Sequence, residues 1–156
     1  MLLVRLTIIC VGRLSREYRG VADHYVRLLR PYATVDMREV PEVPISHGSG
    51  RVLSAEGDQL VRRLRPGAYT TVLERGGREF TSEALSAHLA AEKLYGRSDF
   101  QFILGGALGL DERVLGSADL VWSLSRLTFP HQLARCVVLE QLYRAMRIER
   151  GEPYHH

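Results

Sequence analysis

Cysteine is scarce in this sequence, and its placement argues against two common ways of stabilising a small domain. The 156 residues include only two cysteines, Cys10 and Cys136, which lie far apart in apolar runs and form no CxxC pair. Disulfide frameworks and structural zinc sites need more numerous or more closely spaced cysteines. We therefore expect two reduced, buried thiols in a cytoplasmic protein, with no disulfide and no metal site.

Long apolar segments are also lacking. A membrane-spanning helix needs about 20 consecutive apolar residues, and no stretch reaches that length. The opening residues 1–12 are apolar, but Arg5 interrupts them and no small-residue cleavage site follows. A buried strand explains this segment better than a signal peptide does.

Two familiar phosphate-binding signatures are missing, namely GxxxxGK[ST] and GxGxxG. Lysine is almost absent too, because 20 of the 21 basic residues are arginine. With 18 acidic residues the net charge is +3. A charge of this size permits a phosphate-rich partner such as RNA without requiring one.

The composition and the pattern of elements predict one α/β domain. A chain of this length with 46% hydrophobic residues suits a single core, and no repeats or linkers divide it. Strands are expected at residues 3–11, 35–40, 69–73, 100–104 and 120–124, and helices at 16–30, 51–65, 82–95, 111–116 and 131–149. This alternation predicts a mostly parallel sheet of five or six strands with helices on both faces.

Two segments between these elements are expected to be irregular, a proline- and glycine-rich loop at 41–50 and a tight turn at 74–78. The helix at 16–30 begins after Ser15, which can cap it. His47, in the first of these loops, is interpreted as a solvated side chain.

The last predicted helix, at 131–149, is apolar around much of its circumference, so one sheet cannot cover it. Pro130 suits the first helical turn, and Thr128 could accept a hydrogen bond from a free backbone donor there. The second cover is either another copy of the chain in a two-fold dimer or further parts of the same monomer. We favour the dimer.

Three loops follow predicted strands, at residues 73–77, 105–109 and 124–129. In parallel sheets, ligands bind beyond the carboxyl ends of the strands, and glycines let a ligand approach the backbone. Gly105 and Gly106 by themselves also fit a tight turn without a ligand.

Taken together, these loops and the C-terminal segment closely resemble the bacterial family of large-subunit rRNA pseudouridine N3-methyltransferases, within the SPOUT superfamily. The resemblance covers the whole chain and is densest after Phe100. It is carried by Leu73-Glu-Arg-Gly76, Leu104-Gly-Gly-Ala-Leu-Gly-Leu110, Trp122-Ser-Leu-Ser-Arg-Leu-Thr-Phe-Pro-His-Gln-Leu133, Glu140-Gln-Leu-Tyr-Arg-Ala145 and Pro153-Tyr-His155.

The resemblance implies an enzyme that uses S-adenosyl-L-methionine, a homodimer, large-subunit rRNA as partner, and a C-terminal trefoil knot. General rules on chain threading would instead favour an unknotted sheet. By similarity, the cofactor-binding residues are Leu73, Gly105, Gly106, Leu124, Ser125, Arg126, Leu127, Thr128 and Phe129. Arg144, Tyr154 and His155 fall on the substrate side. We expect the tail to complete a site partly built by the other subunit.

The roles of individual residues follow from the chemistry that the resemblance implies. Arg144 can stabilise an anion that develops on the base, although it could also form an i,i+4 salt bridge with Glu140. His131 could accept a proton or merely cap the helix start. Tyr154 and His155 suit stacking on an extruded base.

Two departures from the family pattern stand out. Glu74 occupies a position where the family often has Asp, and His156 ends the chain where Lys or Arg is usual, which leaves one phosphate contact in doubt. Residues 155–156 could also be the remnant of a tag. Two other kinds of function are compatible with the residues, a non-catalytic ribosome-associated RNA-binding protein and a small-nucleotide-binding α/β module.

Overall fold

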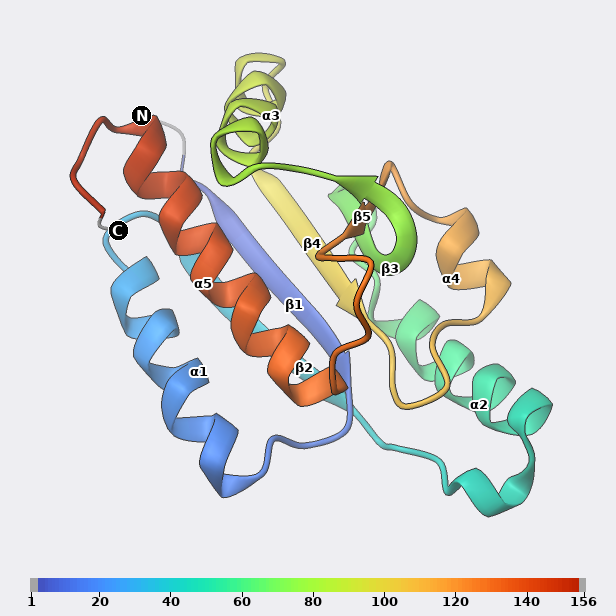
Figure 1. Cartoon of the computed structure of the whole chain (residues 1–156). Helices are drawn as coiled ribbons and strands as arrows, with labels where there is room; N and C mark the ends of the chain where they lie inside the picture. Colours follow the sequence, from blue (N-terminus) through green and yellow to red (C-terminus); the bar gives the residue numbers. More distant parts are fainter. Residues whose placement is uncertain (1–2, 155–156) are drawn as a thin grey trace.

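The computed structural model describes residues 3–154, which form a five-stranded sheet covered by helices on both faces (Figure 1). The elements follow in the order β1 (Arg5–Val11), α1 (Arg16–Leu29), β2 (Thr34–Val40), η1 (Ile45–His47), α2 (Ser49–Arg63), β3 (Tyr69–Glu79), α3 (Ser82–Leu94), β4 (Asp99–Leu104), α4 (Glu112–Gly116), β5 (Leu120–Ser123) and α5 (His131–Glu149).

The strands lie in the order β2-β1-β4-β3-β5, and each neighbouring pair is parallel. The predicted α/β class is confirmed, with five strands. Because all strands run in one direction, their carboxyl ends lie along the same edge of the sheet. The loops that follow β4 and β5 lie at this edge together with residues 73–75 in the middle of β3.

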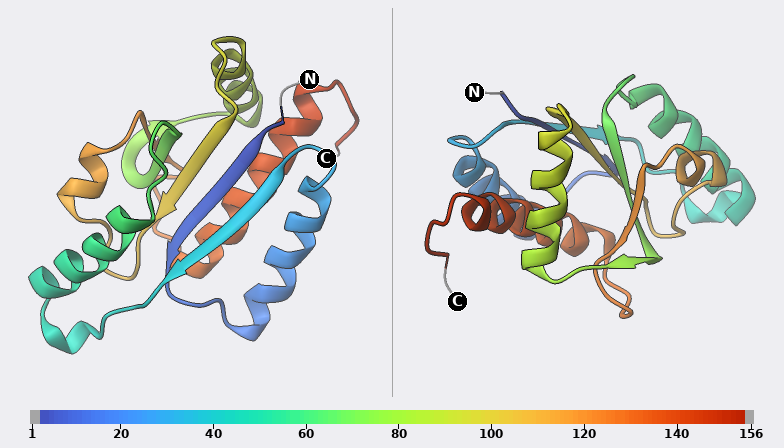
Figure 2. Two further views of the ribbon diagram at one scale, coloured as in Figure 1. Left: turned by 180° about the vertical axis from the view of Figure 1, so that it is seen from behind. Right: turned by 90° about the horizontal axis from the view of Figure 1, so that it is seen from above.

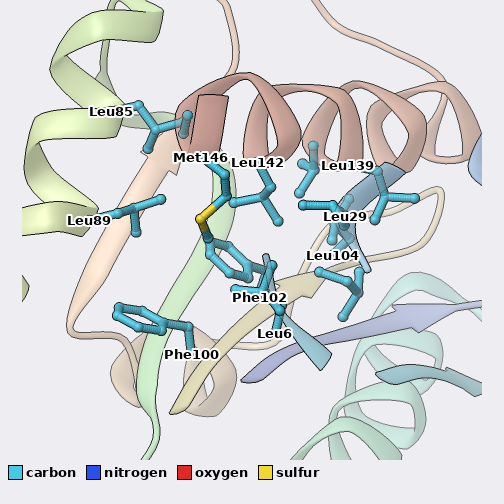
Figure 3. Close-up of a cluster of buried hydrophobic side chains, with 14 of the residues drawn as sticks. Leu6, Leu29, Leu85, Leu89, Phe100, Phe102, Leu104, Leu139, Leu142 and Met146 are labelled. Atoms are coloured by element: carbon cyan, nitrogen blue, oxygen red, sulfur yellow. The ribbon is translucent and has the colours of Figure 1, made fainter. Parts of the chain in front are cut away.

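Helices α1, α3 and α5 cover one face of the sheet, and α2 and α4 cover the other (Figure 2). Successive strand residues point to opposite faces, so Ile8 joins the larger core under α5 whereas Ile9 joins the smaller core under α2. The larger core is drawn in Figure 3 and includes Leu6, Leu29, Leu85, Leu89, Phe100, Phe102, Leu104, Leu139, Leu142 and Met146.

Helix α5 lies between α1 and α3 (Figure 1). The Ser86 hydroxyl of α3 donates to the carbonyl of Ala145 at 2.7 Å, and the Cys136 thiol lies 3.6 Å from the carbonyl of Tyr18 in α1. The sheet alone does not bury the apolar surface of α5, as expected. Two helices of the same chain, α1 and α3, bury most of the rest of that surface. The apolar surface left outward is narrow, with Leu133 36% exposed and Val137 half-buried.

Two segments differ from the expectation for them. Residues 41–50 are partly helical, because η1 lies within them and Gly48, at a φ of 90°, lets the chain turn into α2 at Ser49. The prediction of a tight turn at 74–78 is also wrong. Leu73 and Arg78 both pair with Trp122 of β5, so residues 74–77 bulge out and the strand then continues to Glu79.

Both cysteines are buried and free, as the spacing predicts. Burial raises the pKa of the Cys10 thiol to about 12. No helix within residues 3–154 is long and apolar enough to cross a membrane.

Candidate active site

The bulge of β3 and the carboxyl ends of β4 and β5 surround a cavity of about 390 Å³. Its walls come from the bulge of β3, the loop after β4, the loop after β5 and the first turn of α5. They comprise Leu73, Glu74, Arg75, Leu104, Gly105, Gly106, Ala107, Leu108, Gly109, Leu110, Trp122, Leu124, Ser125, Leu127, Thr128, Phe129, His131 and Ala134.

Of the nine predicted cofactor residues, eight line this cavity and Arg126 does not. Arg126 is exposed, because the loop turns its side chain outward between Ser125 and Leu127. Residue-level reasoning missed Trp122 and Ala134, which face the cavity from a strand and a helix. Their apolar character gave no signal that separates a cavity wall from a core position.

The loop after β4 is built from glycine because its backbone doubles back tightly. The Gly109 amide donates to the Gly106 carbonyl at 3.2 Å, and Gly109 has a φ of 91°. A Cβ on Gly105 would lie 2.4 Å from the Gly109 carbonyl oxygen, so a larger residue there would force the loop open. The result is a rim of main-chain groups facing the cavity.

One hydrogen bond joins two of the segments that line the cavity, and another orders one of them internally. Arg75, in the bulge of β3, donates from Nη1 to the Thr128 hydroxyl at 2.6 Å. The Ser125 hydroxyl accepts from the Leu127 amide at 3.0 Å and thereby orders the loop after β5. Thr128 therefore fixes two cavity loops to each other and does not cap α5, contrary to the expectation for it.

His131 is the first residue of α5 and lines the cavity. The position before it, Pro130, is the N-cap and makes no side-chain capping bond, so a capping role for His131 is not observed. One turn on, the buried guanidinium of Arg135 pairs with Glu39 at 2.6 Å and donates to the Gly12 carbonyl at 2.9 Å. These bonds hold the start of α5 against the ends of β1 and β2.

Arg144 belongs to a separate cluster near the other end of α5. Its Nε donates to Glu140 Oε1 at 2.9 Å, so the alternative i,i+4 salt bridge is present. The Tyr154 hydroxyl donates to the same Glu140 oxygen at 2.8 Å. Burial and this bond raise the pKa of the Tyr154 phenol.

The tail that carries Tyr154 is tied down by Arg147, which pairs with Glu152 and donates to the Pro153 carbonyl. Tyr32 also donates to Glu152, at 2.8 Å. Tyr154 is thereby held over α5, and its ring lies 5.1 Å from that of Tyr143. His155 is predicted to contact the substrate, and His156 departs from the Lys or Arg that is usual in the family. Both residues, which could also be the remnant of a tag, lie outside the described residues.

The model of one protein family, described as predicted SPOUT methyltransferase, matches residues 4–155. The chain belongs to the SPOUT methyltransferase family. It is 45% identical to the ribosomal RNA large subunit methyltransferase H of Pelotomaculum thermopropionicum, over 97% of this chain and 98% of that protein. The protein with the same description from Moorella thermoacetica is 43% identical, over 98% and 99% respectively.

Solved structures of other methyltransferases have the same fold. A probable methyltransferase from Bordetella pertussis superimposes with a TM-score of 0.60 at 16% identity, covering 92% of this chain and 95% of that chain. The tRNA (m1G37) methyltransferase of Aquifex aeolicus gives 0.56 at 14% identity, covering 99% and 75%. At these identities the likeness concerns the fold alone.

SPOUT methyltransferases use S-adenosylmethionine, and the residues of the cavity fit this cofactor. The volume of the cavity lies in the usual range for sites of small ligands, roughly 300–1,000 Å³. Leu73, Leu127 and Phe129 supply apolar walls for a base, and the glycine loop supplies main-chain polar groups. Within residues 3–154, no group of three or more His, Cys, Asp or Glu side chains could hold a metal ion.

Proposed function

We propose that this SPOUT methyltransferase methylates N3 of a pseudouridine in large-subunit ribosomal RNA. The observation that carries the proposal is the 45% identity to a ribosomal RNA large subunit methyltransferase H over nearly the full length of both chains. The convergence of the family's three loop motifs on one cavity supports it. The non-catalytic alternative is less well supported, because a protein that only binds RNA has no need of this cavity.

Held by the apolar walls and the glycine loop of the cavity, the cofactor would supply an electrophilic methyl group on a sulfonium. The chain itself would have to position the base for attack and to stabilise the base once its N3 proton leaves. The arginine of the Arg144 cluster is the natural stabiliser, because a fixed cation lowers the energy of a developing anion. We assign proton acceptance to His131, which lies in the cavity wall.

Arg144 cannot perform this role in its own subunit's cavity. It follows His131 by 13 residues on one straight helix, which is about 20 Å along the axis, and an arginine side chain is much shorter. Neither Arg144 nor Tyr154 lines the cavity. We infer that the active site is completed by a second copy of the chain, whose Arg144 and Tyr154 reach the cavity of the first.

The outward stripe of α5 suits such a contact. Leu133 and Val137 lie on it at adjacent turns, and Val137 also borders a second hollow of about 220 Å³ beside Phe80 and Leu124. A two-fold axis near this stripe would place the carboxyl half of one α5 by the amino end of the other. We therefore propose a homodimer held by α5.

The C-terminal trefoil knot of the family is part of the proposal. Strand β5 lies at the edge of the sheet, whereas α5 returns to the middle of one face between α1 and α3. The connection between them passes beside the β3–α3 segment, because Phe80 and Ser82 share a hollow with Leu124 and Val137. This path is compatible with a chain threaded through that segment.

The test is methyl transfer to large ribosomal subunits purified from cells that lack this protein. We expect one labelled methyl group per subunit, mapped by mass spectrometry to N3 of a pseudouridine. Protein-free RNA of the same sequence transcribed without pseudouridine is the matched control and should stay unmethylated. Binding without transfer would support the non-catalytic alternative, and transfer to another base would refute the acceptor proposed here.

A further inference from the structure

The net positive charge of the chain is concentrated in one segment. Residues 13–30 hold five arginines and two acidic residues, a net charge of +3. The other residues hold 16 basic and 16 acidic side chains and therefore balance. The whole excess charge of the protein thus resides on α1, the turn that precedes it and the C-cap residue Arg30.

These arginines, Arg13, Arg16, Arg19, Arg27 and Arg30, form what we call the arginine stripe, and all five are exposed. Arg16, Arg27 and Arg30 repeat at spacings of 11 and 3, which places them on one side of α1. Ala22 and Leu29 are buried on the sheet side of the helix. The stripe therefore runs along an outward side of α1 from one end to the other.

The stripe is turned away from α5. Tyr18 and Tyr25 lie on the side of α1 that faces the larger core, and the carbonyl of Tyr18 contacts Cys136 of α5. At 100° per residue, Arg16 and Arg27 project more than a third of a turn from these tyrosines. Helix α1 lies at the outer edge of the molecule, with α5 on its inner side (Figure 1). The proposed dimer contact along α5 therefore leaves the outward side of α1 open.

The arginines of the stripe are not engaged by acidic side chains. Within residues 3–154, none of the five takes part in an ion pair, although nine such pairs hold other side chains together. Asp23 lies among them on the helix but pairs with none. Arg19 donates from Nη2 to the Leu14 carbonyl at 3.0 Å. A guanidinium without such a bond keeps its planar fork free for a phosphate, which it can bind through two parallel hydrogen bonds.

We propose that the arginine stripe binds the sugar–phosphate backbone of the ribosomal RNA and orients it toward the active site, an inference that rests on the proposed function. The stripe extends about 21 Å along α1, enough to follow several phosphates. It lies on the same face of the sheet as the Arg144 cluster, which is linked to the end of α1 through Tyr143 and Tyr32. RNA held along α1 would thus pass beside the side chains that meet the base.

The experiment compares two triple variants of the full-length protein. The stripe variant carries Arg16→Gln, Arg27→Gln and Arg30→Gln. The control variant carries Arg51→Gln, Arg62→Gln and Arg63→Gln, which removes the same charge from exposed positions of α2 on the opposite face. Binding of protein-free large-subunit rRNA, purified from cells lacking the protein, is measured over a range of KCl concentrations.

We expect the stripe variant to bind this RNA about a hundredfold more weakly at 0.15 M salt, with a salt slope smaller by about two to three. S-adenosylmethionine affinity and dimer mass should not change. Equal losses in the two variants would overturn the proposal, since they would show only a nonspecific effect of charge. Unchanged binding to RNA with impaired methylation of intact subunits would overturn it in favour of a ribosomal protein as partner.

The role of the arginine stripe and the proposed function can be refuted independently of each other. If the wild-type protein neither binds nor methylates large-subunit rRNA, the proposed function is wrong and the stripe has no substrate to guide. If the wild-type protein methylates its pseudouridine and the stripe variant does so with the same apparent RNA affinity, only the stripe inference is refuted.

Discussion

The guanidinium of Arg144 lies 4.0 Å above the centre of the Tyr154 ring of the same chain. Both side chains also contact one carboxylate oxygen of Glu140. The arginine and the tail therefore form one unit, whichever cavity they serve. In a shared site, the tail and Arg144 of one chain would therefore both serve the cavity of the other subunit.

Arg144→Ala should slow methyl transfer by roughly 10²–10³, because a cation that stabilises the developing anion is removed. S-adenosylmethionine affinity should stay the same, since Arg144 does not line the cavity. Single-turnover methylation and calorimetry separate the two effects. Arg62→Ala, on the exposed far side of the sheet, is the control, and truncation after Gly151 should reproduce the Arg144→Ala result. A loss of cofactor binding in Arg144→Ala would contradict this assignment.

Mixing two impaired variants, at an S-adenosylmethionine concentration too low to saturate the Gly105→Ala cavity, tests whether the active site is shared between subunits. A Gly105→Ala subunit has a damaged cavity and an intact Arg144 cluster, whereas an Arg144→Ala subunit has the reverse. If the cluster of one chain serves the cavity of the other, a heterodimer contains one complete site and regains about half of the activity per dimer. No recovery in a verified heterodimer would show that each cluster serves its own cavity.

Gly105→Ala should weaken S-adenosylmethionine binding by roughly tenfold to a hundredfold, because a strained loop costs on the order of 1–3 kcal/mol. The added Cβ would clash with the Gly109 carbonyl and displace the rim of the cavity. Gly116→Ala is the matched control, since a Cβ there meets nothing within 4 Å. Isothermal calorimetry gives both affinities, and circular dichroism checks the fold. An unchanged affinity for folded Gly105→Ala would place the cofactor elsewhere.

Leu133→Glu should convert the protein into a monomer of 17.6 kDa by placing a charge on the outward stripe of α5. The comparable change Leu94→Glu, at a side chain that is 90% exposed at the end of α3, should leave the dimer intact. Sedimentation velocity distinguishes the two masses. The proposed interface is wrong if Leu133→Glu sediments like the wild type.

Stability should fall as the pH rises above 9, in part because of Cys10. Its pKa is 9.0 in an ordinary environment and about 12 in the folded chain. Between these values the folded state keeps a proton that the unfolded state has released, so each pH unit costs about 1.4 kcal/mol of unfolding free energy. Urea unfolding of the wild type and Cys10→Ala between pH 8 and 11 measures this. The slope should be shallower by that amount in the variant, and equal slopes would contradict the assignment.

Local patterns in the sequence determined much of this protein. The bounds of α5 agree with the predicted helix at both ends, because the apolar spacing begins after Pro130 and persists to Glu149. The order of strands and helices, and hence the shared edge where ligands bind, follows from alternation alone. The three loop motifs together with the C-terminal segment were sufficient to identify the family, because they require particular residues at fixed spacing.

Tertiary structure decided the features that depend on neighbours distant in the chain. The bulge at residues 74–77 exists because β5 pairs with β3 on both sides of it. No residue within the bulge predicts that pairing. Periodicity showed that α5 needs a second cover, yet only the packing shows that α1 and α3 supply most of it. The distance of about 20 Å between His131 in the cavity wall and Arg144 likewise follows from their positions along one helix that packs against the sheet. Sequence spacing records which residues share an element, whereas the distance between chemical groups is fixed by how whole elements pack.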